Sequence, residues 1–186
     1  MATGKQSTQQ TADLASLVDA INRVQAVIEF NLDGTIITAN DNFLAAVGYS
    51  LADIQGHHHR MFVDPDYAKS DDYAQFWKNL NDGKFDQGQY KRFTKDGHEI
   101  HIQASYNPVF DDKGKPYKVV KFATDITAQK LQTADYEGQI DAISKSQAVI
   151  EFNLDGTIIN ANDNFLGATG YSIDEIKGKH HRMFVD

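Results

Sequence analysis

Residues 26–64 read AVIEFNLDGTIITANDNFLAAVGYSLADIQGHHHRMFVD, and residues 148–186 repeat this stretch at 31 of 39 positions without a gap. The offset of 122 residues is too long for a solenoid unit, which runs about 20–50 residues, and suits a domain plus a connector. The second copy stops at Asp186, the equivalent of Asp64. We therefore expect one complete module followed by the opening part of a second, in a fragment of a longer tandem-repeat protein.

The repeated stretch itself predicts two strands followed by a helix. Residues 27–39 read as a β-hairpin, because the Asp-Gly pair at its centre supplies a turn residue that tolerates positive φ. Asp41 is expected to cap a short helix. We expect Asn40 and Asn42 to hold the turn between strand and helix through hydrogen bonds from their side chains to the backbone.

The residues that follow predict a helical block and then three more strands. Ser50 begins another short helix, with Asp53 three positions later as in a capping box, and 70–82 forms a longer helix with an apolar stripe. In the strand at 98–110, apolar residues alternate cleanly with polar ones. The three strands are expected at 87–94, 98–110 and 117–124. Strands that flank a helical block indicate an α+β fold, with a five-stranded antiparallel sheet and the helices on one face.

The chain is expected to divide into four parts. Apolar residues at helical spacing in 11–25 predict an amphipathic helix. A lone hairpin is marginally stable in water, so the second copy is expected to be loosely ordered, or to exchange with the first copy. The parts are an N-terminal tail and helix (1–25), a complete module (26–127), a helical connector (128–147) and the truncated second module (148–186).

Composition excludes several function classes. The 186 residues carry 18 Lys and Arg against 26 Asp and Glu, a net charge of −8. Such a chain repels phosphate, which argues against bulk binding of nucleic acid or of an anionic membrane surface. The absence of cysteine rules out disulfides, thiolate metal sites and a flavin photocycle that forms a thiol adduct. The sequence also lacks a signal peptide and any apolar run of membrane-spanning length, so we expect a cytoplasmic location.

The order of motifs resembles the Per-Arnt-Sim (PAS) sensory domain of methyl-accepting chemotaxis receptors and aerotaxis sensors. The matching pieces are VIEFNLDGTIITANDNFLAAVGYS, GHHHRMFVDPDY, FWKNLNDGKF and YNPVFDDKGKPYKVVKFATDIT. Together they cover residues 26–127, and the match recurs at 148–186. The resemblance implies a curved antiparallel sheet that holds a pocket under its helices. It also implies an output through Asp125 and Thr127 into the exit helix, a homodimer formed through the flanking helices, and a downstream signalling domain that controls a histidine kinase.

The resemblance leaves the cofactor open between flavin (FAD), haem and none. Trp77, Phe76 and Phe85 resemble the aromatic positions of redox-sensing aerotaxis domains, where they would wall a flavin ring. Arg92 stands where those sensors carry an asparagine, and Phe85 is displaced by one position. Trp77 can equally pack the helix on the sheet, and Arg92 can be a polar group of a mostly apolar pocket.

The histidines are the other candidates for binding. Three adjacent histidines at 57–59 point in divergent directions, so we expect a cap or packing role for them and no metal site. A haem needs an axial ligand, which is most often histidine. The candidates are His58, His59, His98 and His101.

Two functions follow from these observations. The first is a sensory module that detects a small ligand, redox state or gas through its pocket. The second is a PAS scaffold without cofactor, for dimerisation or protein interaction. No phosphate-binding loop, nucleophile elbow or metalloprotease motif is present, so we do not expect an enzyme.

Overall fold

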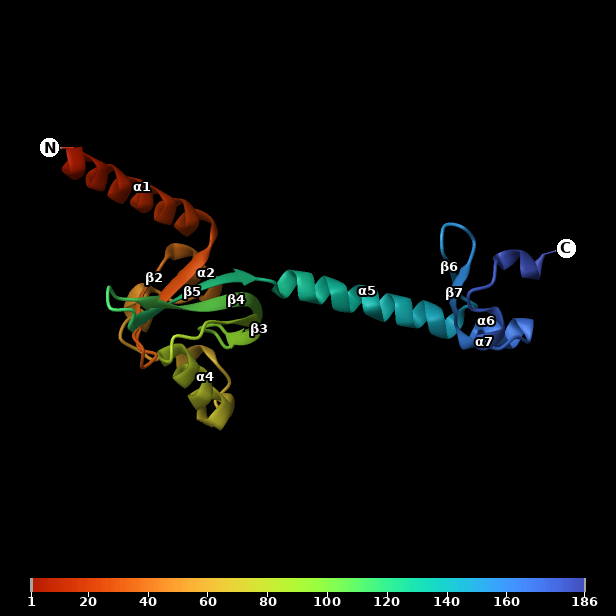
Figure 1. The fold of residues 1–186 in the computed structure, drawn as a ribbon. Coiled ribbons are helices and arrows are strands. Elements are labelled where there is room, and N and C mark those ends of the chain that lie inside the picture. The colour runs from red at the N-terminus through yellow and green to blue at the C-terminus, as the bar shows by residue number, and fades with distance from the viewer. Residues whose placement is uncertain (1, 186) are drawn as a thin grey trace. The chain divides into compact units, whose positions relative to one another are not determined.

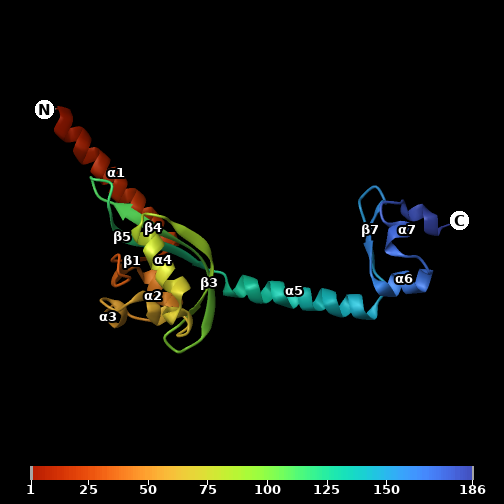
Figure 2. The same ribbon diagram turned by 60° about the horizontal axis from the view of Figure 1, so that its bottom comes forward.

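The computed structural model describes the backbone of residues 2–185 and the side chains of residues 9–185. The chain forms two compact units, residues 1–128 and 129–186, and each is described by itself. Figures 1 and 2 show the elements of both units from two directions.

The first unit begins with a long helix and ends at the start of another. Helix α1 covers Ala2–Val24 and is longer than the helix expected at 11–25. Its remaining elements are β1 (Ala26–Phe30), β2 (Ile36–Ala39), α2 (Asp41–Val47), α3 (Leu51–Ile54), the 3-10 turns η1 (His59–Phe62) and η2 (Tyr67–Lys69), α4 (Asp71–Asn81), β3 (Asp86–Phe93), β4 (Glu99–Phe110) and β5 (Pro116–Asp125).

The five strands form one antiparallel sheet in the order β2-β1-β5-β4-β3. Helices α2, α3 and α4 group together against it (Figure 2), and their apolar residues share one core with its inner face. The α+β fold predicted from the sequence is therefore confirmed. The alternation expected in β4 is also present, because Ile100, Ile102, Ala104 and Tyr106 are buried while the residues between them are not.

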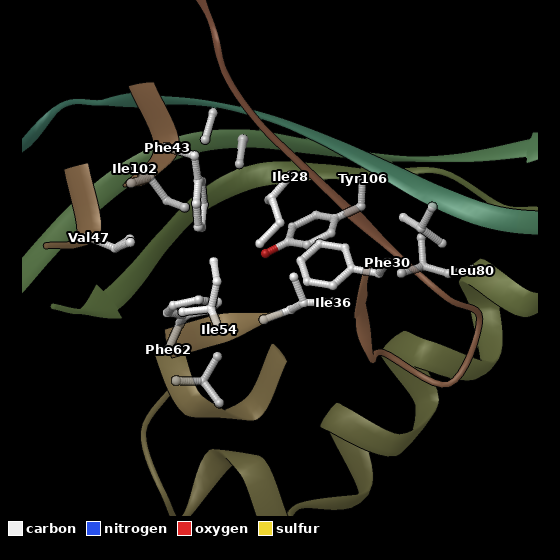
Figure 3. Close-up of a cluster of buried hydrophobic side chains, with 14 of the residues drawn as sticks. Ile28, Phe30, Ile36, Phe43, Val47, Ile54, Phe62, Leu80, Ile102 and Tyr106 are labelled. Atoms are coloured by element: carbon white, nitrogen blue, oxygen red, sulfur yellow. The ribbon is translucent and has the colours of Figure 1, made fainter. Parts of the chain in front are cut away.

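The core lies between this inner face and the helices. Figure 3 shows the ring of Tyr106 beside Phe30 and Ile28, with its hydroxyl oxygen directed into the interior. Phe30, Ile28 and Leu80 are completely buried. Burial of this apolar surface is the main stabilising contribution to such a domain.

Asn40, rather than the expected Asp41, caps helix α2. The side-chain oxygen of Asn40 accepts the N–H of Phe43, and Asp41 is the first residue of the helix. Asn40 also accepts the N–H of Val27 and donates to the carbonyl of Gln25. Its amide both accepts and donates in these bonds, which a carboxylate cannot do. The expected role of Asn40 in holding the turn is thus confirmed.

The other predicted starts of helices agree with the structure. Ser50 and Asp53 form the capping box of α3, and the side chain of Ser70 accepts the N–H of Tyr73 at the start of α4. Both caps satisfy backbone donors that a helix leaves free at its first turn.

The second unit repeats the local structure of the first copy. Helix α5 covers Thr127–Ser146, and a two-stranded antiparallel sheet follows. The later elements are β6 (Ile150–Phe152), β7 (Ile158–Ala161), α6 (Asp163–Thr169), α7 (Ile173–Ile176) and the 3-10 turn η3 (His181–Phe184). No helix in the described part of the chain combines the length and apolar character that crossing a bilayer requires.

Candidate ligand site

Polar side chains converge inside the first unit, beneath the sheet. Tyr106 on β4 pairs with Lys121 on β5, so both point to the same face, and Arg92 on β3 points inward opposite Ile100. His59 reaches the same region from η1. The pleat of the three neighbouring strands therefore places two cationic residues within the core.

His59 is completely buried and links two tyrosines. Its Nδ1 lies 2.9 Å from the hydroxyl oxygen of Tyr73, and its Nε2 lies 3.1 Å from that of Tyr106. Burial, with a smaller contribution from the Arg92 and Lys121 charges, holds the pKa of His59 well below its usual value. The neutral ring can donate from one nitrogen and accept at the other, which satisfies both contacts.

Each of the two tyrosine hydroxyls stays protonated in this environment. Burial raises the pKa of Tyr73 to about 12 and raises that of Tyr106 as well. The Tyr106 oxygen also accepts a hydrogen bond from Arg92 Nη2 at 2.9 Å. Tyr106 is thus the centre of a network that joins η1, β3 and β4.

Arg92 is only partly satisfied by protein groups. Its side chain is 5% exposed, and besides the bond to Tyr106 its Nη1 donates to the carbonyl of Lys91. Its Nε has no hydrogen-bond partner among the described residues. The guanidinium carbon lies 5.0 Å from the centre of the Tyr90 ring, a cation–π contact.

Lys121 is the most unusual residue of the interior. It is 1% exposed, and no hydrogen bond or ion pair joins its ammonium to another described residue. Its Nζ lies 5.0 Å from the centre of the Tyr106 ring and 5.5 Å from that of Phe43. Burial, reinforced by the charge of Arg92, brings the pKa of Lys121 well below its usual value.

Arg92 and Lys121 line one cavity of about 20 Å³. Its other walls are mainly apolar, and Asp125 contributes at its edge. The apolar walls are Ala26, Phe43, Ala46, Val47, Phe62, Ile100, Ile102 and Ala123. The lining combines apolar walls with a few polar groups, as in a ligand site, but the space is far below the roughly 300–1,000 Å³ of a small-molecule pocket.

Comparison with known proteins identifies the fold family. A family model described as the PAS fold matches residues 36–123, and one described as the PAS domain matches residues 146–186. The chain belongs to the PAS family. The resemblance inferred from the sequence is therefore confirmed for both copies, and the cavity lies in the first PAS domain.

Two curated relatives are bacterial proteins. The Biofilm dispersion protein BdlA of Pseudomonas aeruginosa is 44% identical over 167 residues, which cover 90% of this chain and 40% of BdlA. The Aerotaxis receptor of Escherichia coli is 29% identical over 105 residues, which cover 56% of this chain and 20% of the receptor. The chain thus spans less than half the length of either relative.

Solved structures agree on the PAS fold. The PAS domain of a protein from Colwellia psychrerythraea superposes with a TM-score of 0.54 at 23% identity, covering 62% of this chain and 98% of that one. A light-oxygen-voltage domain gives a TM-score of 0.52 at 20% identity, covering 68% of this chain and 96% of that one.

Of the residues proposed for a flavin site, the structure brings three together. Trp77 is buried, Phe76 is half-buried, and both rings pack on His59. Arg92 joins them through Tyr106. Phe85, however, is 65% exposed and forms no part of this cluster.

The first PAS domain as it stands does not fit a flavin or a haem. The aromatic rings fill the interior, and a space of about 20 Å³ admits only a water-sized group. Both ring nitrogens of His59 are used by tyrosines. The imidazoles of His98 and His101 pair with Asp96 and Glu99, respectively.

The side chain of His58 makes a hydrogen bond to the backbone. Its Nδ1 accepts the N–H of Arg60 and so caps η1. A Cβ at Gly34 would lie 2.7 Å from its Nε2, and Gly34 has φ of +86°, so only glycine suits this turn. The cap role expected for the histidine run is confirmed for His58.

Among the described residues, no group of three or more histidine or acidic side chains is placed to hold a metal ion.

Asp125 and Thr127 join the sheet to the exit helix. Asp125 Oδ1 accepts the N–H of Thr127 at 2.8 Å. The hydroxyl oxygen of Thr127 accepts the N–H of His101 on β4 at 2.9 Å. The N–H of Ile126 donates to the carbonyl of the same His101. The first residue of α5 is therefore held by both β4 and β5.

Sequence reasoning missed Lys121 and the role of His59 as a neutral bridge. The sequence suggested for His59 a cap or packing role or that of a haem ligand. Lys121 lies two residues from Val119 and two residues from Ala123, which are also buried. This alternation along β5 is the pattern that indicates an inward side chain at Lys121.

Proposed function

We propose that the first PAS domain is the sensory module of a chemotaxis-type receptor, and that the state of its interior cavity is relayed through β5 to α5. The observation that supports this is the course of β5. Lys121 on this strand lines the cavity, and so does Asp125, which holds the first residue of α5. One strand thus connects the interior with the exit helix within five residues.

The relatives support the class of protein. Similarity to an aerotaxis receptor supports a sensory role, and we propose that this domain lies in the cytoplasm and controls a downstream signalling domain and its histidine kinase. Helices α1 and α5 flank the domain, and α1 exposes Leu14, Leu17 and Val18 at helical spacing. We propose that a homodimer forms through these flanking helices.

The relay is tested by amide hydrogen exchange in the 186-residue chain. Lys121→Met changes the charge in the cavity, and we expect it to alter the exchange of the α5 amides by roughly fivefold, the equivalent of one hydrogen bond. Thr127→Val removes the bond to β4 and should abolish this response. Thr133→Val is the matched control, since the hydroxyl of Thr133 bonds only within α5.

The second candidate function is a scaffold without ligand, favoured by the exposed apolar residues of α1. This function requires a dimer in which Lys121→Met leaves the hydrogen exchange of the α5 amides unchanged. An α5 that does not respond, in a chain that sedimentation shows to be dimeric, would replace the sensory proposal with the scaffold.

A further inference from the structure

Lys121 places an amino group in the interior of the first PAS domain, on the strand that leads to α5. The residue is 1% exposed, and no hydrogen bond or ion pair joins its Nζ to another described residue. The centres of the Tyr106 and Phe43 rings lie 5.0 Å and 5.5 Å from Nζ. In such surroundings an ammonium is costly and a neutral amine is tolerated far better, because only the ion loses a large hydration energy.

The titratable and charged groups around Lys121 supply no counter-ion. Arg92 on β3 is itself a cation, Tyr106 on β4 keeps its hydroxyl proton, and His59 on η1 is neutral. Helix α2 and strand β1 contribute apolar residues to the cavity. Asp125 is the one acid among the described residues that line it, but Asp125 is exposed and its carboxylate accepts a backbone N–H at the start of α5.

The volume of the cavity restricts what it can detect. At about 20 Å³, the cavity that Lys121 lines admits only a water-sized group. An organic ligand is therefore excluded from this conformation. A proton needs no such space, and it changes the charge of the amino group that lines the cavity.

We propose that the ligand of this cavity is a proton, bound by the amino group of Lys121. This rests on the proposed function, because it names the ligand of the same sensory cavity. The step forms one N–H bond, between a proton from the solvent and the lone pair of Nζ. Acidification then places a positive charge on β5 beside Arg92. Such a charge favours conformations that admit water to the cavity, and β5 is the strand that holds the first residue of α5.

The direction of the pH effect follows from linkage. Burial, reinforced by the charge of Arg92, brings the pKa of Lys121 well below its usual value. The unfolded chain binds a proton at Lys121 below about pH 10.4, whereas the native chain stays neutral there until its own lower pKa is reached. Unfolding therefore takes up a proton in this interval. The equilibrium constant for unfolding should rise up to about tenfold for each pH unit that the pH falls, and level off where the native chain binds the proton.

Proton binding is measured by NMR of the 186-residue chain labelled with ¹⁵N-lysine, between about pH 5 and pH 9. We expect one side-chain nitrogen signal to pass from the position of a neutral amine to that of an ammonium as the pH falls. Lys121→Met should remove this signal, and methionine fits the same buried site without a charge.

Chemical denaturation between about pH 7 and pH 9 is the second measurement. In this window His59 is neutral in both states, and tyrosines, which ionise near pH 10 in the unfolded chain, contribute little. The wild type should lose stability as the pH falls, by up to tenfold in the unfolding constant per unit. Lys121→Met should lack this dependence.

The matched control is Lys118→Met. Lys118 lies on the same strand, three residues from Lys121, and its Nζ pairs with Glu29 at a distance of 2.8 Å. This variant should keep both the titrating signal and the pH dependence of the wild type.

The outcomes separate this inference from the proposed function. Lysine signals that all remain those of ammonium groups up to pH 9, a titrating signal that survives Lys121→Met, or a Lys121 that stays neutral until the domain unfolds would each overturn the proton assignment. The relay would still stand if the α5 amides responded to Lys121→Met. Titration of Lys121 that leaves the exchange of the α5 amides unchanged, after correction for the intrinsic pH dependence of exchange, would support proton binding and overturn the relay.

Discussion

The two copies of the repeat, residues 26–64 and 148–186, share nearly the same sequence but differ in burial. Phe30 is 0% exposed, whereas its counterpart Phe152 is 42% exposed. His59 is completely buried between two tyrosines, whereas His181 is exposed. The buried core of the second copy consists of Ile158, Ala161 and Ile176, with partly buried side chains around it.

Local hydrogen bonding is nevertheless the same in both copies. Asn162 accepts the N–H groups of Val149 and Phe165, as Asn40 accepts those of Val27 and Phe43. Ser172 and Glu175 form a capping box like that of Ser50 and Asp53. The short-range hydrogen bonds are thus set by the sequence of the repeat. Burial depends instead on β3, β4, β5 and α4, which pack against the first copy.

The largest difference between the copies is expected for the aromatic residue of the first strand. Phe30→Ala removes a fully buried ring and should lower the free energy of unfolding by about 3–5 kcal/mol. Phe152→Ala is the matched variant, and the half-exposed ring should cost less than about 1 kcal/mol. Hydrogen exchange of the most protected amides in each copy measures both losses, because the fluorescence of Trp77, which packs on Phe30, reports on the first unit. Equal losses would show that the second copy buries its core as the first does.

A smaller difference is expected in the response to acid. The native state keeps His59 neutral, whereas the unfolded chain protonates it below about pH 6.5, so unfolding takes up a proton and stability falls as the pH falls. This contribution amounts to at most about 1.4 kcal/mol per pH unit, or about 2 kcal/mol between pH 6.5 and pH 5. His59→Gln retains a donor and an acceptor and should flatten this part of the stability profile.

His181→Gln is the control for the acid response, because it makes the same change at an exposed position. Denaturation at a series of pH values from 5 to 8 compares the two variants with the wild type. A steep acid dependence that persists in His59→Gln would show that another group takes up the proton.

The smallest difference is expected at the asparagine caps. Asn40→Ala and Asn162→Ala remove matching sets of hydrogen bonds, and each should cost about 1–2 kcal/mol of local stability. Hydrogen exchange should show faster exchange at Phe43 and at Phe165 by similar factors. An effect at only one of these sites would contradict the view that the caps act independently of burial.

Much of the fold could be predicted because its signals are local. The order of strands and helices, the capping box of α3 and the alternation in β4 all follow from patterns within a few residues. Even so, Asp41 was a wrong choice of cap for α2, since Asn40 makes contacts with Asn22 and Gln25 at the end of α1 that the local pattern does not reveal.

The candidate site was harder to predict because its residues lie far apart in the chain. Trp77 and Phe76 were candidates through family resemblance, Arg92 was a candidate as a polar group of the pocket, and the three lie together. Phe85 was grouped with them on position alone, but it follows the turn at Gly83 and faces solvent. The exposure of a residue after a turn depends on the path of the backbone, which spacing does not define.

By itself, the sequence determined the repeat, the two PAS copies and the capping box of α3, because these depend on neighbouring residues. Only the tertiary structure decided which face of β5 is buried. Both faces of this strand carry apolar residues, and hydrophobicity alone would place Phe122 inside and Lys121 outside. Pairing between β4 and β5 instead aligns Lys121 with the inward Tyr106. The burial of Lys121 is therefore a consequence of strand register, since a shift of one residue would exchange the two faces.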